Sequence, residues 1–297
     1  MKKWNLLIDV AKCFNCNCCT LACHDEYHDN EHPGVAAGMP KHGQNWFRIE
    51  QRETGVVPMV EVSYLPTTCN HCDDPPCLAA AHDGAVVKRD DGIVIIVPEK
   101  ARGQRQIVDA CPYGAVYWNE EKQLPQAWPF DAHLLDQGWK RTRGAQACPT
   151  RAMQVLQVED AEMKRLAAAE GLEVLHPEYG TSPRVWYKNL ARFRTLFIGG
   201  SVAGEIAGVV ECVEGARATL EQRGKAVATA LTDPYGDFKF GGLAIDSGPY
   251  RLSIADPRFG PWSTDLELGA QSVYLRDIAL PPRLVASSAA GGAIPVP

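Results

Sequence analysis

The cysteines of this chain are spaced as metal ligands. Cys13-x2-Cys16-x2-Cys19-x3-Cys23 is a run in which three thiols wrap a 4Fe–4S cubane and the fourth points toward a neighbouring cluster. A second run, Cys69-x2-Cys72-x4-Cys77, follows. In two-cluster ferredoxins the missing ligand comes from a distant Cys-Pro pair. This chain has two such pairs, Cys111-Pro112 and Cys148-Pro149, so the spacing predicts iron–sulfur clusters.

The two runs are best completed reciprocally. An internally duplicated ferredoxin unit lets each run of three cysteines take its fourth ligand from the paired half of the duplication. We therefore assign cluster one to Cys13, Cys16, Cys19 and Cys148. Cluster two takes Cys69, Cys72, Cys77 and Cys111.

Zinc and disulfides are the alternatives to iron. Zinc ribbons need two separated Cys-x2-Cys pairs, and they have no use for a third cysteine at a three-residue step followed by a Cys-Pro. The opening MKKWNLLIDV is too short and too mixed for a secretory signal, and no apolar run reaches membrane-spanning length. We therefore expect a cytoplasmic, reducing environment in which close thiols bind metal. The net charge of −6 argues against a nucleic-acid partner.

The 297 residues are enough for two domains, and the pattern predicts an α+β chain. Residues 1–158 read as a duplicated bacterial-ferredoxin-like module, with an inner unit at about 61–119 and short apolar strands between turns. A helix at 160–171 and a connector fill 159–195. Residues 196–283 alternate apolar and polar side chains and predict a small antiparallel β-sandwich of the Cna-B/transthyretin-like kind. The tail, 284–297, is predicted to be flexible.

Within the sandwich region, apolar runs separated by turn residues such as Arg223-Gly224 and Ser247-Gly248 predict individual strands. The predicted strands are Ala216–Leu220, Val227–Thr232, Phe238–Phe240 and Tyr250–Ile254. The region contains no Ser–His, Cys–His or paired-carboxylate arrangement that indicates a site, and Cys212 is expected in its core.

Several segments carry a family resemblance. LIDVAKCFNCNCC, YLPTTCNHCDDPPC and DACPYGAVYWNEE, together with the metal-free stretches DGIVIIVPEKARG, AHLLDQGW and GLEVLHPEYGTSPRVWYKNL, resemble the four-cluster, ferredoxin-type subunits of the dimethyl sulfoxide reductase family of molybdenum enzymes. The likeness is strongest to the transhydroxylase branch, whose members move hydroxyl groups between polyhydroxylated aromatics such as pyrogallol and phloroglucinol. It implies a large catalytic partner that holds molybdenum in a bis-pterin guanine dinucleotide cofactor.

The chain departs from the four-cluster pattern in two of the cysteine runs, where other residues stand at the expected ligand positions. A third run and its reciprocal ligand would place cysteines at residues occupied by Ala101, Gln104, Ile107 and Ala81. The last run would place them at Trp128, Asp131 and Gly144, beside Cys23. One thiolate and one carboxylate, Cys23 and Asp131, are too few to hold a cubane. We therefore expect two clusters and no third.

Other polar residues have simpler interpretations. Cys18 is expected to be a free thiol and Cys23 an unliganded thiol in a packed interior. His24, His28, His32 and His42 are expected to be solvated or interfacial. The basic segment at Lys140, Arg141 and Arg143 reads as a solvated face that could also offset cluster charge or contact a partner.

The resemblance implies an electron-transfer subunit in a heterodimer, which is not itself catalytic. Cubanes with four thiolates have no open coordination site, so they move single electrons. Two alternatives stay open. One is the small subunit of a net-oxidising aromatic hydroxylase of the resorcinol hydroxylase type, or of another molybdopterin oxidoreductase. The other is a scaffold subunit whose clusters are redox-silent.

Overall fold

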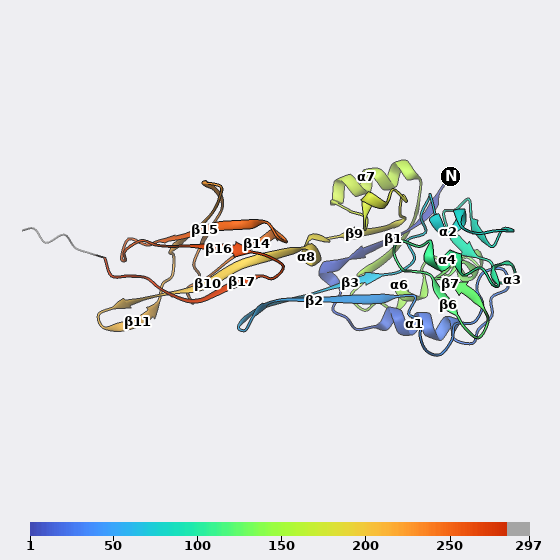
Figure 1. Cartoon of the computed structure of the whole chain (residues 1–297), viewed down its shortest axis with the longest axis horizontal. Helices are drawn as coiled ribbons and strands as arrows, with labels where there is room; N and C mark the ends of the chain where they lie inside the picture. Colours follow the sequence, from blue (N-terminus) through green and yellow to red (C-terminus); the bar gives the residue numbers. More distant parts are fainter. Residues whose placement is uncertain (284–297) are drawn as a thin grey trace, which may run out of the picture. The chain divides into compact units, whose positions relative to one another are not determined.

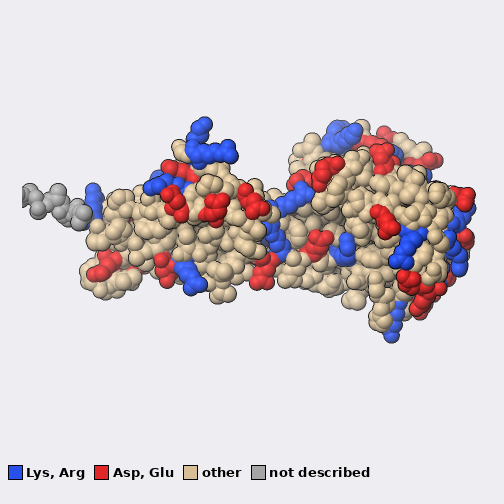
Figure 2. All heavy atoms as spheres, in the orientation of Figure 1, with Lys and Arg blue, Asp and Glu red and all other residues tan. Residues whose placement is uncertain are grey.

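The computed structural model describes residues 1–283, and the predicted tail at 284–297 lies outside the described residues. The chain divides into two compact units (Figure 1). Of the described residues, one unit comprises 1–52 and 62–193, and the other comprises 53–61 and 194–283. Among the described residues, no helix is both long and apolar enough to cross a membrane. Acidic and basic side chains are interspersed on the face that Figure 2 shows.

A three-stranded sheet joins the beginning of the N-terminal unit to its end. β1 (Lys3–Asp9) lies between β8 (Met153–Val158), which is antiparallel to it, and β9 (Val185–Lys188), which is parallel. Leu6 and Ile8 of β1 are fully buried because both neighbours flank the strand. This sheet holds the segment before Cys13 beside the segment after Cys148.

Hairpins and short helices fill the rest of the N-terminal unit. The helices are α1 (Cys18–Tyr27), α2 (Pro76–Ala79), α3 (Pro98–Ala101), α4 (Gln106–Asp109), α5 (Ala132–Asp136) and α6 (Arg143–Ala147). The two-stranded sheets are β2 (Arg48–Val56) with β3 (Met59–Thr67), β4 (Val86–Lys88) with β5 (Val94–Ile96), and β6 (Tyr117–Asn119) with β7 (Leu124–Gln126). The mixture of short strands and helices fits the predicted α+β class.

The predicted helix after the module is confirmed as α7 (Asp160–Glu170). Gly171 ends it in the left-handed conformation, with φ of 63°, and its N–H donates to the carbonyl of Ala167. Met163 of α7 is buried against Leu7 of β1 and Leu172. The helix therefore covers one face of the three-stranded sheet.

The C-terminal unit is built from two four-stranded sheets with one shared core. In the first sheet, β10 (Thr195–Ile206) pairs with β11 (Val209–Cys212), β14 (Asp237–Ala244) and β17 (Val273–Ala279). In the second, the order is β13 (Lys225–Leu231), β12 (Arg217–Gln222), β15 (Gly248–Ala255), β16 (Trp262–Leu268). The four strands predicted in this region are confirmed.

Three features of the C-terminal unit differ from what the sequence suggests. β10 and β17 pair in parallel, so the sandwich is not wholly antiparallel. The tip of the β2–β3 hairpin belongs to this unit, where Thr54 Oγ1 donates to Ser272 Oγ at 2.9 Å. The prediction that Cys212 is a core residue is wrong. Cys212 is exposed because β11 is an edge strand whose four residues all lie open to solvent.

Candidate iron–sulfur centres

The first set of predicted ligands converges where β1 ends and β8 begins. The Asp9 N–H donates to the Ala152 carbonyl at 2.8 Å and fixes the two segments side by side. Cys19 lies in the first turn of α1, which packs against α6, the helix that directly precedes Cys148. The Cys13 thiol interacts electrostatically with those of Cys16 and Cys148, and Cys19 interacts with Cys13 and Cys16. The structure thus brings all four thiols together.

The turn that carries these thiols depends on two asparagines. Asn15 and Asn17 adopt the left-handed backbone conformation, with φ of 61° and 58°. Asparagine is one of the few residues other than glycine that adopts this conformation readily. The Asn17 side chain also donates to the Asn15 carbonyl at 3.1 Å. The tight turn between Cys13 and Cys19 therefore follows from the residues that separate the cysteines.

The second set converges from three segments of the inner part of the unit. Cys69 and Cys72 follow β3, Cys77 lies on α2, and Cys111 follows α4. The Cys69 thiol interacts electrostatically with Cys77, Cys111 and Cys72. Cys77 and Cys111 also pack against the core around Ile107. These four thiols therefore lie near one another, and their assignment as the ligands of one cluster stays a prediction.

The electrostatics of both sets favour a bound cationic group. Burial, and secondarily the neighbouring thiolates, raise the pKa of Cys19 to about 11 and that of Cys77 to about 12. Thiolates are the form that binds metal, and a metal ion makes deprotonation favourable where crowded thiols would otherwise keep their protons. No cysteine of the chain is in a disulfide, and all eleven lie within residues 1–283. Four converging thiols are the donor set that a cubane needs.

One half-buried lysine supports the loop of the second set. Lys88 Nζ donates to the carbonyls of His71 at 3.0 Å, Cys72 at 2.7 Å and Gly92 at 2.8 Å. It also pairs with Asp73 at 2.9 Å, and Asp73 in turn pairs with Arg184. The cations near this site are therefore neutralised within the chain. Sequence reasoning missed Lys88, because nothing in the segment around it marks a contact with a loop sixteen residues earlier.

His71 lies between two of the predicted ligands and is neutral. Burial lowers the pKa of its imidazole to about 3. Its Nδ1 accepts a hydrogen bond from the Val94 N–H at 3.1 Å, so the ring proton is on Nε2. Within residues 1–283, Nε2 has no hydrogen-bond partner. His71 sits in the gap of a Cys-x2-Cys pair, and that position is the signal that could have identified it.

Replacing Lys88 with methionine is expected to loosen the second site. The change keeps most of the length of the side chain, but it leaves the carbonyls of His71, Cys72 and Gly92 without this donor, at a cost of about 2–4 kcal/mol. Asp73 keeps its pair with Arg184. We expect iron to leave the second site first when the loaded protein is titrated with a chelator, followed by iron analysis. Lys100→Met, at an exposed lysine, is the control and should release iron like the unsubstituted protein. Equal release from both variants would contradict a supporting role.

A closed hydrogen-bond network occupies the position of the last cysteine run. Asp131 is 1% exposed, and its carboxylate accepts hydrogen bonds from Tyr27 Oη at 2.8 Å, Trp128 Nε1 at 2.8 Å and the Arg143 N–H at 2.6 Å. Burial raises the pKa of Asp131. Cys23 is buried beside it, and burial together with the Asp131 charge raises the pKa of its thiol well above the usual range. Both oxygens of the Asp131 carboxylate are therefore engaged by protein donors.

Aromatic rings fill the space around this network. Trp128 stacks on Phe130 with centroids 4.8 Å apart and meets Phe47 edge-on at 4.6 Å. On its other side, His71 contacts it edge-on at 5.4 Å. A Cβ built at Gly144 would lie 3.5 Å from Cys19 Cβ, which is ordinary van der Waals contact. The aromatic packing therefore extends from the first set of thiols to the loop of the second.

The position of the other missing run is also filled. Ile107 is fully buried in a core with Val86, Val94 and Ala101, and Ala81 packs against it. Gln104 Oε1 accepts from the His82 N–H at 2.9 Å, and its Nε2 donates to the Lys100 carbonyl at 2.9 Å. Side chains and hydrogen bonds thus stand where a four-cluster relative would place ligands.

The histidines near the first turn make protein contacts. His32 stacks on His133 with ring centroids 3.8 Å apart, and His133 Nε2 lies 2.8 Å from Glu26 Oε1. These three residues have donor atoms within 4.8 Å of one another. Arg143 Nε lies 3.1 Å from the other Glu26 oxygen and supplies a fixed positive charge there. His133, which sequence reasoning did not single out, belongs to this ion-paired group. His133 lies in the segment AHLLDQGW, whose family resemblance is the sequence signal that could have identified this residue.

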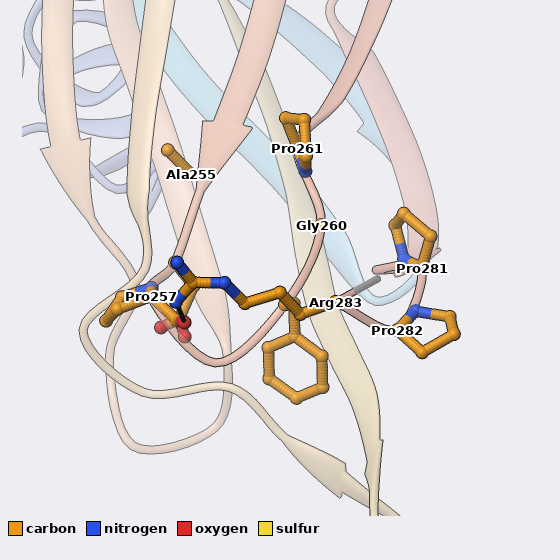
Figure 3. A pocket seen from close by; sticks show the side chains of 9 residues that line it. Ala255, Pro257, Gly260, Pro261, Pro281, Pro282 and Arg283 are labelled. Carbon is orange, nitrogen blue, oxygen red and sulfur yellow. Dashed lines mark hydrogen bonds between the residues drawn. The ribbon is translucent and has the colours of Figure 1, made fainter. Parts of the chain in front are cut away.

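A cavity of about 750 Å³ lies in the C-terminal unit (Figure 3). Its walls include Pro257, Phe259, Pro261 and Pro281. The one carboxylate in the described lining, Asp256, accepts hydrogen bonds from the N–H and Nε of Arg258 at 2.8 and 2.9 Å. Among the described residues that line it, there is therefore no free nucleophile or acid–base pair.

Comparison with known proteins places this geometry in a family. The protein-family model described as a 4Fe-4S dicluster domain matches residues 60–158. The chain is 44% identical over 257 residues to the pyrogallol hydroxytransferase small subunit of Pelobacter acidigallici, covering 86% of this chain and 91% of that protein. It is 32% identical over 193 residues to a subunit of the tetrathionate reductase of Salmonella typhimurium, covering 63% of this chain and 73% of the relative.

A third relative matches about half of the chain. The beta subunit of the dimethylsulfide dehydrogenase of Rhodovulum sulfidophilum is 38% identical over 152 residues, which is 50% of this chain and 46% of that protein. The alignment with the hydroxytransferase subunit is long enough to include much of the C-terminal unit as well. The resemblance predicted from the sequence is confirmed. This chain belongs to the family of iron–sulfur small subunits that includes the pyrogallol hydroxytransferase small subunit.

Proposed function

We propose that this chain is the electron-transferring iron–sulfur subunit of a molybdenum hydroxyltransferase and that it holds two 4Fe–4S clusters. The observation that carries the proposal is the convergence of eight thiols into two groups of four. The proposed ligands of cluster one are Cys13, Cys16, Cys19 and Cys148. Those of cluster two are Cys69, Cys72, Cys77 and Cys111.

The chain's own residues would hold, shield and electrostatically balance the clusters. When bound, each cluster supplies one-electron redox chemistry. Cys19 and Cys72 are buried, so protein covers part of each site. Lys88 fixes the loop of the second site, and the asparagine turns shape the loop of the first. Four thiolates leave a cluster no open position for substrate, which fits a subunit that passes electrons to a partner.

The filled positions support a count of two clusters. A third cluster would need three more ligands around Cys23, where Trp128, Asp131 and Gly144 stand instead. Asp131 accepts three hydrogen bonds there, and its carboxylate is committed to the fold. A fourth cluster would need the space that Ile107 and Gln104 occupy.

The partner would be a large catalytic subunit in a heterodimer, holding molybdenum as the bis-pterin guanine dinucleotide. The relative named for pyrogallol hydroxytransfer supports a reaction that moves hydroxyl groups between polyhydroxylated aromatics such as pyrogallol and phloroglucinol. Within this chain, the proposal includes a ferredoxin-like domain at 1–158, a helix and connector at 159–195 and a Cna-B/transthyretin-like sandwich at 196–283. That sandwich would support the complex.

Metal analysis of the native complex tests the proposal. We expect about eight iron atoms per small chain, as two cubanes require, and molybdenum in the co-purifying large chain. Zinc at the thiols, or about twelve iron atoms, would contradict the ligand assignment. Conversion of pyrogallol without an external electron acceptor is the expected activity. A strict need for an acceptor with resorcinol would instead indicate a net-oxidising hydroxylase, and clusters that dithionite cannot reduce would indicate a scaffold.

A further inference from the structure

A basic pocket of about 440 Å³ is lined by residues that are near Cys13 and Cys148 in the sequence. Its floor comes from the beginning of β8, at Met153, Gln154 and Val155. Four cationic residues line it, and all four are exposed: Lys12, Lys140, Arg141 and Arg151. The pocket is therefore a concave surface with a concentrated positive charge.

The cations are carried by the segments that hold the cluster-one ligands. Lys12 directly precedes Cys13. Lys140 and Arg141 stand before α6, the helix that leads into Cys148. Arg151 follows Cys148, and its backbone N–H donates to the Cys148 carbonyl at 3.2 Å. A molecule bound in the pocket would therefore contact the segments that carry Cys13 and Cys148.

Three of these four positive charges have no ion-pair partner among the described residues. Across residues 1–283, the side chains of Lys140, Arg141 and Arg151 make no hydrogen bond or ion pair, and Lys12 has a 3.7 Å contact with Asp9. The second site differs, because Lys88 and Arg184 there both pair with Asp73. Like charges gathered in a concave surface repel one another and attract an anionic partner.

We propose that this pocket is the docking site for a carboxylate-bearing surface of the catalytic subunit. The inference rests on the proposed function and extends it by placing the contact with the partner at this basic pocket. Complementary charge at such an interface speeds association and fixes its orientation. In this proposal the cations near the two thiol sets have different roles. Lys88 holds the loop of the second set, whereas the cations of the pocket bind the partner.

Charge reversal tests the proposal in the complex of the two subunits. In K140E/R141E we expect association with the large subunit to weaken about tenfold or more and its dependence on salt to flatten. The control is K164E/R165E, which reverses two exposed charges on α7. We expect the control to stay within about twofold of the unsubstituted chain. Both variants are first checked for full iron content and for the EPR signals of both clusters.

Each remaining outcome decides for or against the pocket. Unchanged association in iron-replete K140E/R141E would overturn the proposal. If that variant loses iron, association with the large subunit is measured for K140Q/R141Q instead. This neutral variant must also associate more weakly than the unsubstituted chain. If K140E/R141E abolishes binding of inorganic phosphate while association is unchanged, the pocket is a small-anion site and the proposal fails. If the unsubstituted chain binds no molybdenum subunit, the proposed function itself fails.

Discussion

Replacing Cys148 with serine should remove cluster one and leave cluster two in place. Cys148 is the single ligand that the far end of the N-terminal unit supplies to the first set, and the sequence has no other cysteine between residues 112 and 211 to substitute for it. The hydroxyl of serine is a poor replacement for a soft thiolate on iron. We expect the iron content to fall from about eight to about four atoms per chain, with loss of one of two EPR signals.

Cys18→Ser is the matched control for this prediction. Cys18 is adjacent to Cys19, and its thiol hydrogen-bonds with Cys16, but it lies outside both proposed ligand sets. The control should keep all of the iron and both EPR signals. Full iron in the Cys148 variant, or loss of iron in the Cys18 variant, would show that the ligand register is wrong.

Replacing Asp131 with alanine should strongly destabilise the N-terminal unit without removing a ligand. The change leaves the Tyr27 hydroxyl, the Trp128 indole N–H and the Arg143 N–H buried without an acceptor. Stranding buried donors in this way is expected to lower the free energy of unfolding by about 3–5 kcal/mol. For a unit of this size, we expect the melting temperature of the iron-loaded protein to fall by about 6–20 °C.

Asp136→Ala provides the comparison for Asp131. Asp136 is 49% exposed and pairs with Arg89 at the surface, where ion pairs contribute about 0–1 kcal/mol. The melting temperature of the Asp136→Ala variant should change by no more than a few degrees. The iron content of both variants should stay at about eight atoms per chain. If Asp131→Ala instead loses part of its iron at full stability, Asp131 would be a ligand and the count of two clusters would be wrong.

That the thiols of each predicted set lie near one another could be anticipated, because cluster binding constrains short spacings. The first three ligands of each set lie within nine residues of one another, so local sequence carries the signal. The reciprocal partners were found through the Cys-Pro pairs. The helix at 160–170 was also predictable, because alanine-rich sequence and a terminal glycine act locally.

The contacts that fill the missing cluster positions could not be predicted. The Asp131 network joins residues as far apart as Tyr27 and Arg143, and nothing local in the sequence indicates that they meet. Lys88 reaches back to the Cys72 carbonyl in the same way. Cys212 was misplaced because alternation predicts a strand but not whether that strand lies at the edge of its sheet.

The Asp131 network would make a cluster at this position hard to introduce. Restoring a cubane there would require cysteines at 128, 131 and 144 together, because no single replacement completes a ligand set around Cys23. Each single step would first disturb packed aromatic rings or a satisfied carboxylate. Residues that share one network do not contribute additively. We therefore expect each single substitution toward that ligand set to lower the stability of the protein before any metal is bound.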